Sequence, residues 1–239
     1  ELDHQYSATR VRQADYLSPK YHVVIANPPY MGGKGMNERL AFWLKDNYPD
    51  VKSDLFSAFI VRILEIALPN GLLGMMTPFN WMFLGSFEKL RRKILSNHTI
   101  SSLIRPEFHA FFDSAYVSIC GFTLLKCHHQ HYKGAFIDLQ KFYGADLQPK
   151  MAIEAISNPE CGWFYKASSA DFDKIPGTPI AYWMSERMRN CYVEGDVISS
   201  VIKTAIGLNT GDNARFLRCW YEVGKKICTT ETSIATAKN

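Results

Sequence analysis

Hydrophobic and polar positions along the first 140 residues follow a pattern that predicts strands and helices in alternation. Residues 21–26 are a short, nearly continuous apolar run, which is typical of a strand buried on both faces. Over residues 54–68 apolar positions recur at helical spacing, with Ser53 as the expected N-cap. The Pro-Asn-Gly sequence at 69–71 then predicts a turn.

The same alternation continues to about residue 140. A helix is expected over residues 86–95. Further strands, the last two paired with each other, are expected over residues 72–77, 100–104, 117–126 and 135–139. Strands that alternate with helices indicate an α/β fold whose sheet has crossover connections.

After about residue 140 the pattern becomes weaker. Residues 141–180 predict a linker or insertion, and 167–179 are its most linker-like part. A helix is expected over residues 182–192. The polar residues 209–218 are either the approach to a DNA-recognition module or a surface turn.

Composition describes an ordinary globular protein. The chain has 239 residues, of which 47% are hydrophobic and 21% charged. A net charge of +4 permits nucleic-acid binding without arguing for it. The six cysteines form no C-x-x-C pair, which favours reduced thiols in a cytoplasmic protein. No apolar run is long enough for a membrane span, so we expect no membrane partner.

A rigid tetrapeptide, Asn27-Pro28-Pro29-Tyr30, ends the first predicted strand. A turn alone would explain the two prolines by their fixed φ and missing N–H groups, but it leaves the amide and the aromatic ring unexplained. At the carboxyl end of an α/β strand, such groups meet in a ligand crevice. There the Asn27 side-chain oxygen and the Pro28 carbonyl could accept both protons of one amino group. Tyr30 could stack on the planar base that carries this group.

NPPY after a hydrophobic strand resembles the catalytic motif of the DNA methyltransferases that modify the exocyclic amino group of adenine. Residues 53–82 are similar to the helix, turn and strand that follow this motif in the family, and residues 111–126 to the segment whose aromatic residue stacks on the flipped-out adenine. NPPYMGG, TPFNWMFLGSFEKLR and GLNTGDNARFLRCWYEV resemble the large adenine methyltransferases of BREX phage-defence systems and their relatives among fused restriction–modification enzymes.

The resemblance implies the catalytic half of a Rossmann-like S-adenosylmethionine-dependent methyltransferase fold over residues 1–140. A smaller mixed α/β segment would follow, with the truncated start of a target-recognition region over 181–239. It implies S-adenosylmethionine as cofactor, double-stranded DNA as substrate and no metal, and it leaves room for other phage-defence proteins as partners.

The resemblance also implies roles for individual residues. Tyr30 and Phe112 would sandwich the adenine, and Asp54 and Phe59 would lie near the cofactor. The whole tetrapeptide would be catalytic, namely Asn27, Pro28, Pro29 and Tyr30.

One part of the family pattern is missing. These enzymes bind their cofactor through an earlier strand with an acidic, glycine-rich turn and an acid on the next strand, and nothing before Tyr21 offers them. Gly32, Gly33 and Gly35 follow the catalytic strand and belong to a substrate-side loop. We therefore expect an internal fragment that does not methylate DNA alone. The alternative is a remnant that at most binds DNA or proteins. A protein or RNA methyltransferase is a third possibility, which the broad match disfavours.

Other clusters have ordinary interpretations. The CHHQH sequence at 127–131 invites a metal, but adjacent side chains point to opposite sides, which favours a solvated turn. Arg91, Arg92 and Lys93 are expected on a solvated helix face, with phosphate neutralisation as the alternative. The aromatic residues between 108 and 116 are expected to fill core space, with the base-stacking role reserved for Phe112.

Overall fold

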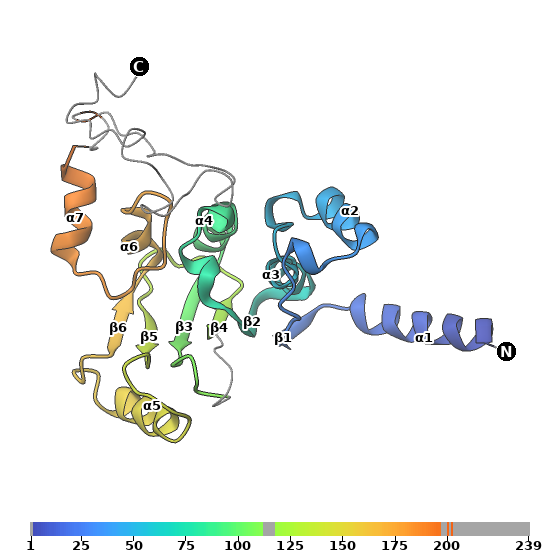
Figure 1. Cartoon of the computed structure of the whole chain (residues 1–239), viewed down its shortest axis with the longest axis horizontal. Coiled ribbons are helices and arrows are strands. Elements are labelled where there is room, and N and C mark those ends of the chain that lie inside the picture. The colour runs from blue at the N-terminus through green and yellow to red at the C-terminus, as the bar shows by residue number, and fades with distance from the viewer. Residues whose placement is uncertain (1, 112–117, 197–199, 201, 203–239) are drawn as a thin grey trace, which may run out of the picture. The chain divides into compact units, whose positions relative to one another are not determined.

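A six-stranded mixed sheet organises the part of the chain that the computed structural model describes, residues 2–111, 118–196, 200 and 202 (Figure 1). The chain divides into two units after residue 195, and all elements below belong to the first. In spatial order β1-β2-β4-β3-β5-β6, the strands are β1 (Tyr21–Ala26), β2 (Ala67–Pro78), β4 (Ile119–Leu125), β3 (Thr99–Arg105), β5 (Gly134–Asp138) and β6 (Phe164–Ala167).

The directions of the strands determine which strand ends lie at the same edge of the sheet. β1 is parallel to β2, and β3 is parallel to β5. β4 lies between β2 and β3 and is antiparallel to both, so β2 and β3 run the same way. β6 is antiparallel to β5. The carboxyl ends of β1, β2, β3 and β5 therefore meet at one edge of the sheet, where α/β proteins place their ligand sites.

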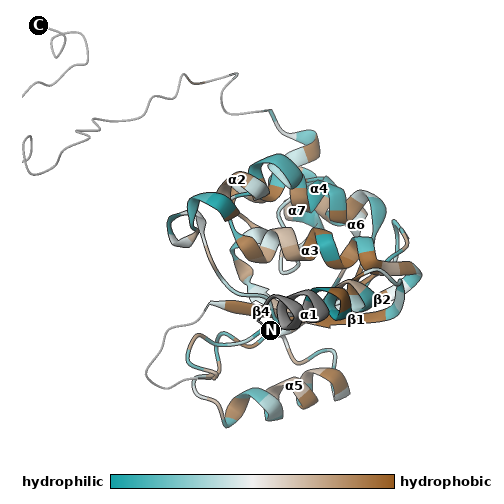
Figure 2. Cartoon of the chain, turned by 90° about the vertical axis from the view of Figure 1, so that its right-hand side faces the viewer, coloured by the Kyte–Doolittle hydropathy of each residue, from teal (hydrophilic) through white to brown (hydrophobic). Residues whose placement is uncertain are grey.

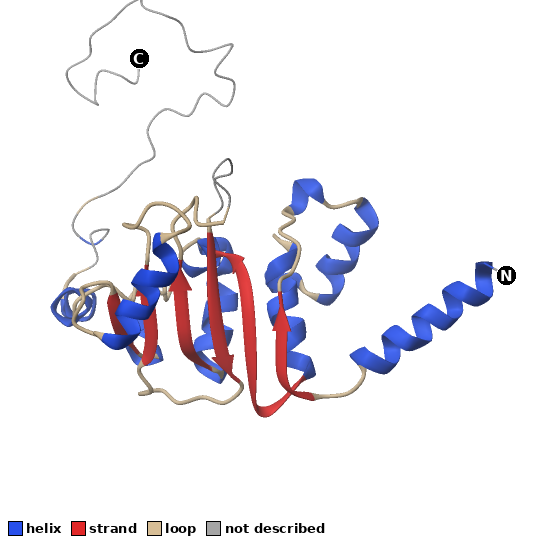
Figure 3. Cartoon of the chain, turned by 90° about the horizontal axis from the view of Figure 1, so that it is seen from below, coloured by secondary structure: helices blue, strands red, loops and turns tan. Residues whose placement is uncertain are grey.

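Helices cover the two faces of the sheet unequally. α3, α4 and α6 lie on one face and α5 on the other (Figures 2 and 3). The α-helices are α1 (Leu2–Leu17), α2 (Glu38–Asn47), α3 (Leu55–Ile66), α4 (Glu88–Asn97), α5 (Leu147–Ser157), α6 (Ser169–Asp173) and α7 (Glu186–Glu194). The short 3₁₀ helices are η1 (Gly33–Gly35), η2 (Pro49–Val51), η3 (Phe79–Met82) and η4 (Gly85–Phe87).

The main core lies between the sheet and α3 and α4. Strand alternation explains it, because Leu73, Met75 and Thr77 of β2 are buried on this face while the residues between them are less buried. Trp81 of η3 is fully buried and its ring centroid lies 5.1 Å from that of Phe122. A smaller cluster under α5 is formed by Ile137, Leu139 and Ala155.

The expectation that β1 is buried on both faces is wrong. Among the described strands β1 pairs only with β2, so it forms the edge of the sheet. Val23 is 56% exposed and Ile25 81% exposed. The apolar run predicted the bounds of the strand. One face packs on the main core through Val24 and Ala26, whereas Val23 and Ile25 point to the opposite face and are exposed there.

Several other expectations are confirmed with corrections. The strands expected at 72–77, 100–104 and 135–139 and the helices at 54–68 and 86–95 are present within a few residues. Asp54, not Ser53, caps α3. The expected turn at 69–71 lies inside β2, where Asn70 has φ +63° and the pairing with β1 is irregular. β5 pairs with β3 instead of β4, because β4 already has a neighbour on each side.

The segment 141–180 contributes structure to the same sheet. It contains α5, β6 and α6, and Phe172 and Ile175 are buried, so residues 167–179 are not a linker. Ser168 and Asp171 form a capping box that starts α6. The helix expected over 182–192 is α7, capped by Ser185. Most of the expected target-recognition region, from 203 onward, lies outside the described residues, and so does the polar loop at 209–218.

Candidate active site

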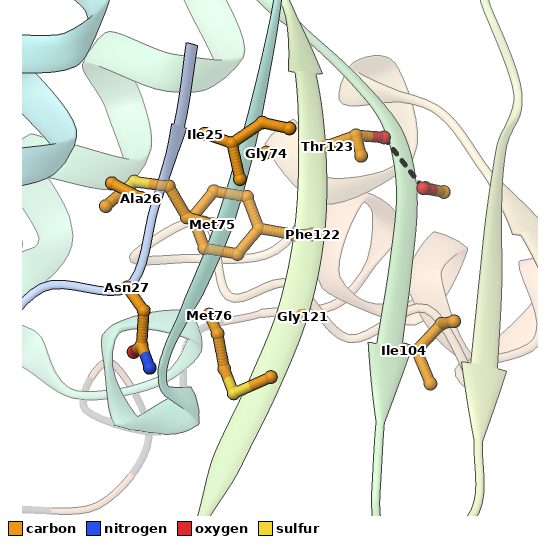
Figure 4. A pocket seen from close by; sticks show the side chains of 11 residues that line it. Ile25, Ala26, Asn27, Gly74, Met75, Met76, Ile104, Gly121, Phe122 and Thr123 are labelled. Atoms are coloured by element: carbon orange, nitrogen blue, oxygen red, sulfur yellow. Dashed lines mark hydrogen bonds between the residues drawn. The ribbon is translucent and has the colours of Figure 1, made fainter.

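Asn27 lies directly after the last residue of β1, at the carboxyl edge of the sheet. It is exposed and borders a cavity of about 410 Å³ on the sheet face opposite α3 and α4. Asn27 and Met76 lie at one end of this cavity (Figure 4). Gly74 of β2 and Gly121 of β4 line it, and because neither has a side chain the sheet is hollowed there. An amide group thus stands open to a space beside the sheet.

Tyr30 is held close to Asn27. Its hydroxyl donates a hydrogen bond of 3.2 Å to Asn27 Oδ1, and its side chain remains partly exposed. Burial and then the neighbouring Cys120 raise the pKa of Tyr30, so the phenol stays protonated and able to donate. The amide oxygen has a second lone pair. Pro28 is buried, which anchors the tetrapeptide against the protein.

The chain after Tyr30 is tied to the beginning of α3. Met31 N–H donates to Asp54 Oδ1 over 3.1 Å, and Leu55 N–H donates to the Met31 carbonyl over 3.0 Å. Gly33 N–H donates to the Ser53 carbonyl over 3.2 Å. Burial raises the pKa of Asp54, an effect opposed by the backbone N–H groups that its carboxylate accepts. Asp54 is therefore engaged with the loop and the helix.

The predicted site residues are not all brought together. Phe59 of α3 is 38% exposed and lines a different hollow, together with Trp43 and Tyr48. Its role near the cofactor stays a prediction. Phe112 lies outside the described residues. The structure thus groups Asn27 and Tyr30 with Asp54, through Met31, whereas Phe59 lines a hollow that does not include Asn27.

Sequence reasoning expected Phe108 in the core and did not foresee that it joins an aromatic and cationic cluster farther along the same edge. Phe79 follows β2, and the Arg105 guanidinium at the end of β3 lies 4.3 Å from the centre of its ring. Phe108 lies against Phe79, with ring centroids 6.0 Å apart. Arg105 also forms an ion pair of 3.7 Å with Asp138, which accepts a hydrogen bond from Tyr182. The ends of successive parallel strands were the signal that could have found this cluster.

The expectation that Arg91 lies on a solvated helix face is wrong. Arg91 is 1% exposed, and its guanidinium donates to backbone carbonyls of the η3–η4 region and of residues 177 and 178. Arg92 is exposed and pairs with Glu88 over 2.8 Å, and Lys93 is exposed. Only these two neighbours match the expectation.

The described residues offer neither a metal-binding group nor a membrane-spanning helix. No group of three or more histidine, cysteine, aspartate or glutamate side chains there is placed to hold a metal ion. His128, His129 and His131 of the histidine-rich turn are exposed. None of the helices described is both long and apolar enough to cross a bilayer.

The fold is shared with restriction–modification enzymes. A structure of the Type ISP restriction–modification enzyme LlaGI, solved with a DNA substrate mimic, superposes with a TM-score of 0.53. The match covers 77% of this chain and 20% of that chain at 16% identity, and at that identity it shows the fold alone. The α/β fold class expected from the sequence is confirmed.

Sequence comparison identifies more specific relatives. Residues 1–112 match the family model of the Eco57I restriction-modification methylase. The adenine-specific methyltransferase PglX of Lacticaseibacillus casei (strain Zhang) is 32% identical over 227 residues, 93% of this chain. The adenine-specific methyltransferase BrxX of Escherichia coli O9:H4 (strain HS) is 34% identical over 216 residues, 89% of this chain. The resemblance predicted from the NPPY motif is therefore confirmed. The chain spans 19% and 17% of the lengths of these two curated relatives.

Proposed function

We propose that this chain is the acceptor-binding part of an adenine-specific DNA methyltransferase that serves in phage defence or restriction–modification. Such an enzyme transfers a methyl group from S-adenosylmethionine to the exocyclic amino group of a flipped-out adenine in double-stranded DNA. The observation that carries the proposal is the position of Asn27, exposed beside a cavity at the carboxyl edge and bonded to Tyr30. It lies within the segment shared with the two adenine-specific methyltransferases.

The acceptor chemistry follows from the tetrapeptide. An exocyclic amine is a poor nucleophile because its lone pair is delocalised into the ring. The Asn27 amide oxygen and the Pro28 carbonyl would accept its two protons and so direct the lone pair outward. The prolines fix the backbone that carries both acceptors. Tyr30 would stack on the extruded base, which repays part of the few kcal/mol that extrusion costs.

We expect the donor side to need more than the residues that the structure describes. S-adenosylmethionine would supply the methyl group, but α1 occupies the segment before β1 and no acidic, glycine-rich turn precedes Tyr21. Val23 and Ile25, whose side chains are exposed, belong to β1, the strand that follows this segment. We therefore assign to this chain only the positioning of the acceptor. Other proteins of a phage-defence system are proposed as further partners.

The isolated chain should not methylate DNA. Methyl transfer needs the donor carbon in line with the amine, and misplacement by about 1 Å costs on the order of 100-fold. Isothermal titration of the chain with S-adenosylmethionine, followed by transfer of labelled methyl groups to mixed-sequence DNA, checks this. Micromolar cofactor binding with turnover would show that the chain holds a complete donor site.

The role of Asn27 is testable in a chimera. The matching segment of the Lacticaseibacillus relative would be replaced by this chain, and adenine methylation of host DNA would be read by sequencing. Asn27→Ala should abolish methylation and leave DNA affinity nearly intact, because affinity comes mainly from phosphate contacts. Asn97→Ala is the matched control, since Asn97 ends α4 and bonds only within that helix among the described contacts. Equal methylation by both variants would refute the assignment.

A further inference from the structure

Asp54 connects two elements that would otherwise meet only through the backbone. Its Oδ1 accepts the Met31 N–H over 3.1 Å and the Phe56 N–H over 3.3 Å. The first donor directly follows Tyr30, and the second belongs to the first turn of α3. One carboxylate oxygen thus joins the NPPY loop to the helix.

Rigidity is needed where the prolines end. Proline rings fix φ at 28 and 29, but Tyr30 and Met31 have no such restraint. Met31 is held at both backbone groups, because its N–H bonds to Asp54 and its carbonyl accepts the Leu55 N–H over 3.0 Å. Tyr30 is therefore fixed between the prolines on one side and an anchored residue on the other.

We infer that Asp54 is a positioning residue for the acceptor loop, acting through Met31 N–H on the orientation of Tyr30 and Asn27. The inference rests on the proposed function in one respect only, namely that this loop holds the methyl acceptor. It is separate from the sequence-based expectation that Asp54 lies near the cofactor, which stays a prediction, because it concerns the Oδ1 atom that two backbone donors engage.

Two substitutions separate the contacts of Asp54. Asp54→Asn keeps a side-chain oxygen at the same distance from the backbone, so it can accept both N–H groups and cap the helix. Asp54→Ser also caps a helix well, but its hydroxyl is one bond nearer the backbone and would serve α3 without reaching Met31. Loop anchoring is therefore removed in the serine variant alone.

Amide hydrogen exchange in the 239-residue chain, followed by NMR, tests the anchor without any need for methylation. In Asp54→Ser, exchange at the Met31 amide should become about 10-fold faster, as expected for loss of one hydrogen bond, while exchange at Phe56 changes by less than about 3-fold. Asp54→Asn should match the original chain at both amides. Unchanged exchange at Met31 in the serine variant, or equal loss in both variants, would overturn the inference.

Kinetics in the chimera distinguish positioning from cofactor contact. A positioning role predicts that Asp54→Ser lowers kcat about 10-fold or more with little change in KM for S-adenosylmethionine, and that Asp54→Asn restores kcat. A direct charge contact with the cofactor instead predicts a raised KM in both variants, which would contradict the inference. If exchange responds as expected but Asn27→Ala leaves methylation intact, the anchor stands and the proposed function fails.

Discussion

Replacing Arg91 with methionine should destabilise the chain far more than the same replacement at Arg92. The Arg91 guanidinium makes five hydrogen bonds to four backbone carbonyls, those of Trp81, Leu84, Gly177 and Thr178. It thereby joins the η3–η4 region to residues 177 and 178, which lie more than 80 residues later in the sequence. Burial lowers the pKa of Arg91, but an arginine remains charged at neutral pH.

The expected cost follows from what the guanidinium leaves behind. The bonds to the carbonyls of Trp81 and Thr178 are buried, and a buried acceptor that loses its donor costs about 1–3 kcal/mol. Two such carbonyls give about 2–6 kcal/mol, part of which is offset because the variant no longer buries a cation. We expect a net loss of about 3 kcal/mol, or a fall in Tm of roughly 6–12 °C for a unit of this size.

The control lies one residue away. Arg92 is exposed and pairs only with Glu88 among the described contacts, so Arg92→Met should cost about 0.3–0.5 kcal/mol. Methionine and arginine have similar helix propensity, so the two variants differ mainly in the contacts they lose. Circular dichroism during heating and urea unfolding give the comparison. If Arg91→Met lowers Tm no more than Arg92→Met does, the carbonyl contacts do not stabilise the fold as argued.

Two further predictions concern buried positions in and beside the strands. Burial first, and then Lys126 and other nearby cations, lower the pKa of His98 from 6.5 to about 4. The unfolded chain therefore binds the proton first, and stability should fall as the pH drops from about 6.5 to about 4; His98→Gln should flatten this part of a urea-unfolding series against pH. A Cβ at Gly134 would lie 2.3 Å from the Ile100 carbonyl oxygen, whereas one at Gly121 meets nothing within 4 Å. Gly134→Ala should thus cost about 1–3 kcal/mol and Gly121→Ala much less, and equal midpoints in urea would contradict this.

Local patterns predicted the elements that are specified by residues close together in the sequence. The apolar run that gives β1 its bounds and the helical spacing of α3 both act within a few residues, and both elements are present. The NPPY motif also predicted that Asn27 stands at the end of a central strand beside a cavity; the strand end and the cavity are present, but the strand is at the edge of the described sheet. The roles of Asn27, Tyr30, Asp54 and Phe59 in catalysis remain predictions.

Features that depend on distant residues could not be predicted. Arg91 in a charged triplet looks solvated, but its guanidinium is buried against carbonyls 7 and 10 residues earlier and others more than 80 residues later, which no local pattern reveals. α5 was missed because Ile153 and Ile156 are exposed, so its apolar positions do not mark a buried face. The pairing of β5 with β3 depends on β4 inserting between β2 and β3, a choice that no local pattern encodes.

The edge position of β1 has a consequence for the order of folding. β3 and β4 pair antiparallel, as do β5 and β6, whereas β1 ends at Ala26 and its sole described partner β2 begins only at Ala67. Closing that parallel connection costs chain entropy before any of its contacts form, which slows such pairings. β1 should therefore pair after β3–β4 and β5–β6 have formed, with mutations there changing the unfolding rate more than the folding rate. The tetrapeptide that defines the site would then be among the last parts of the sheet to become ordered.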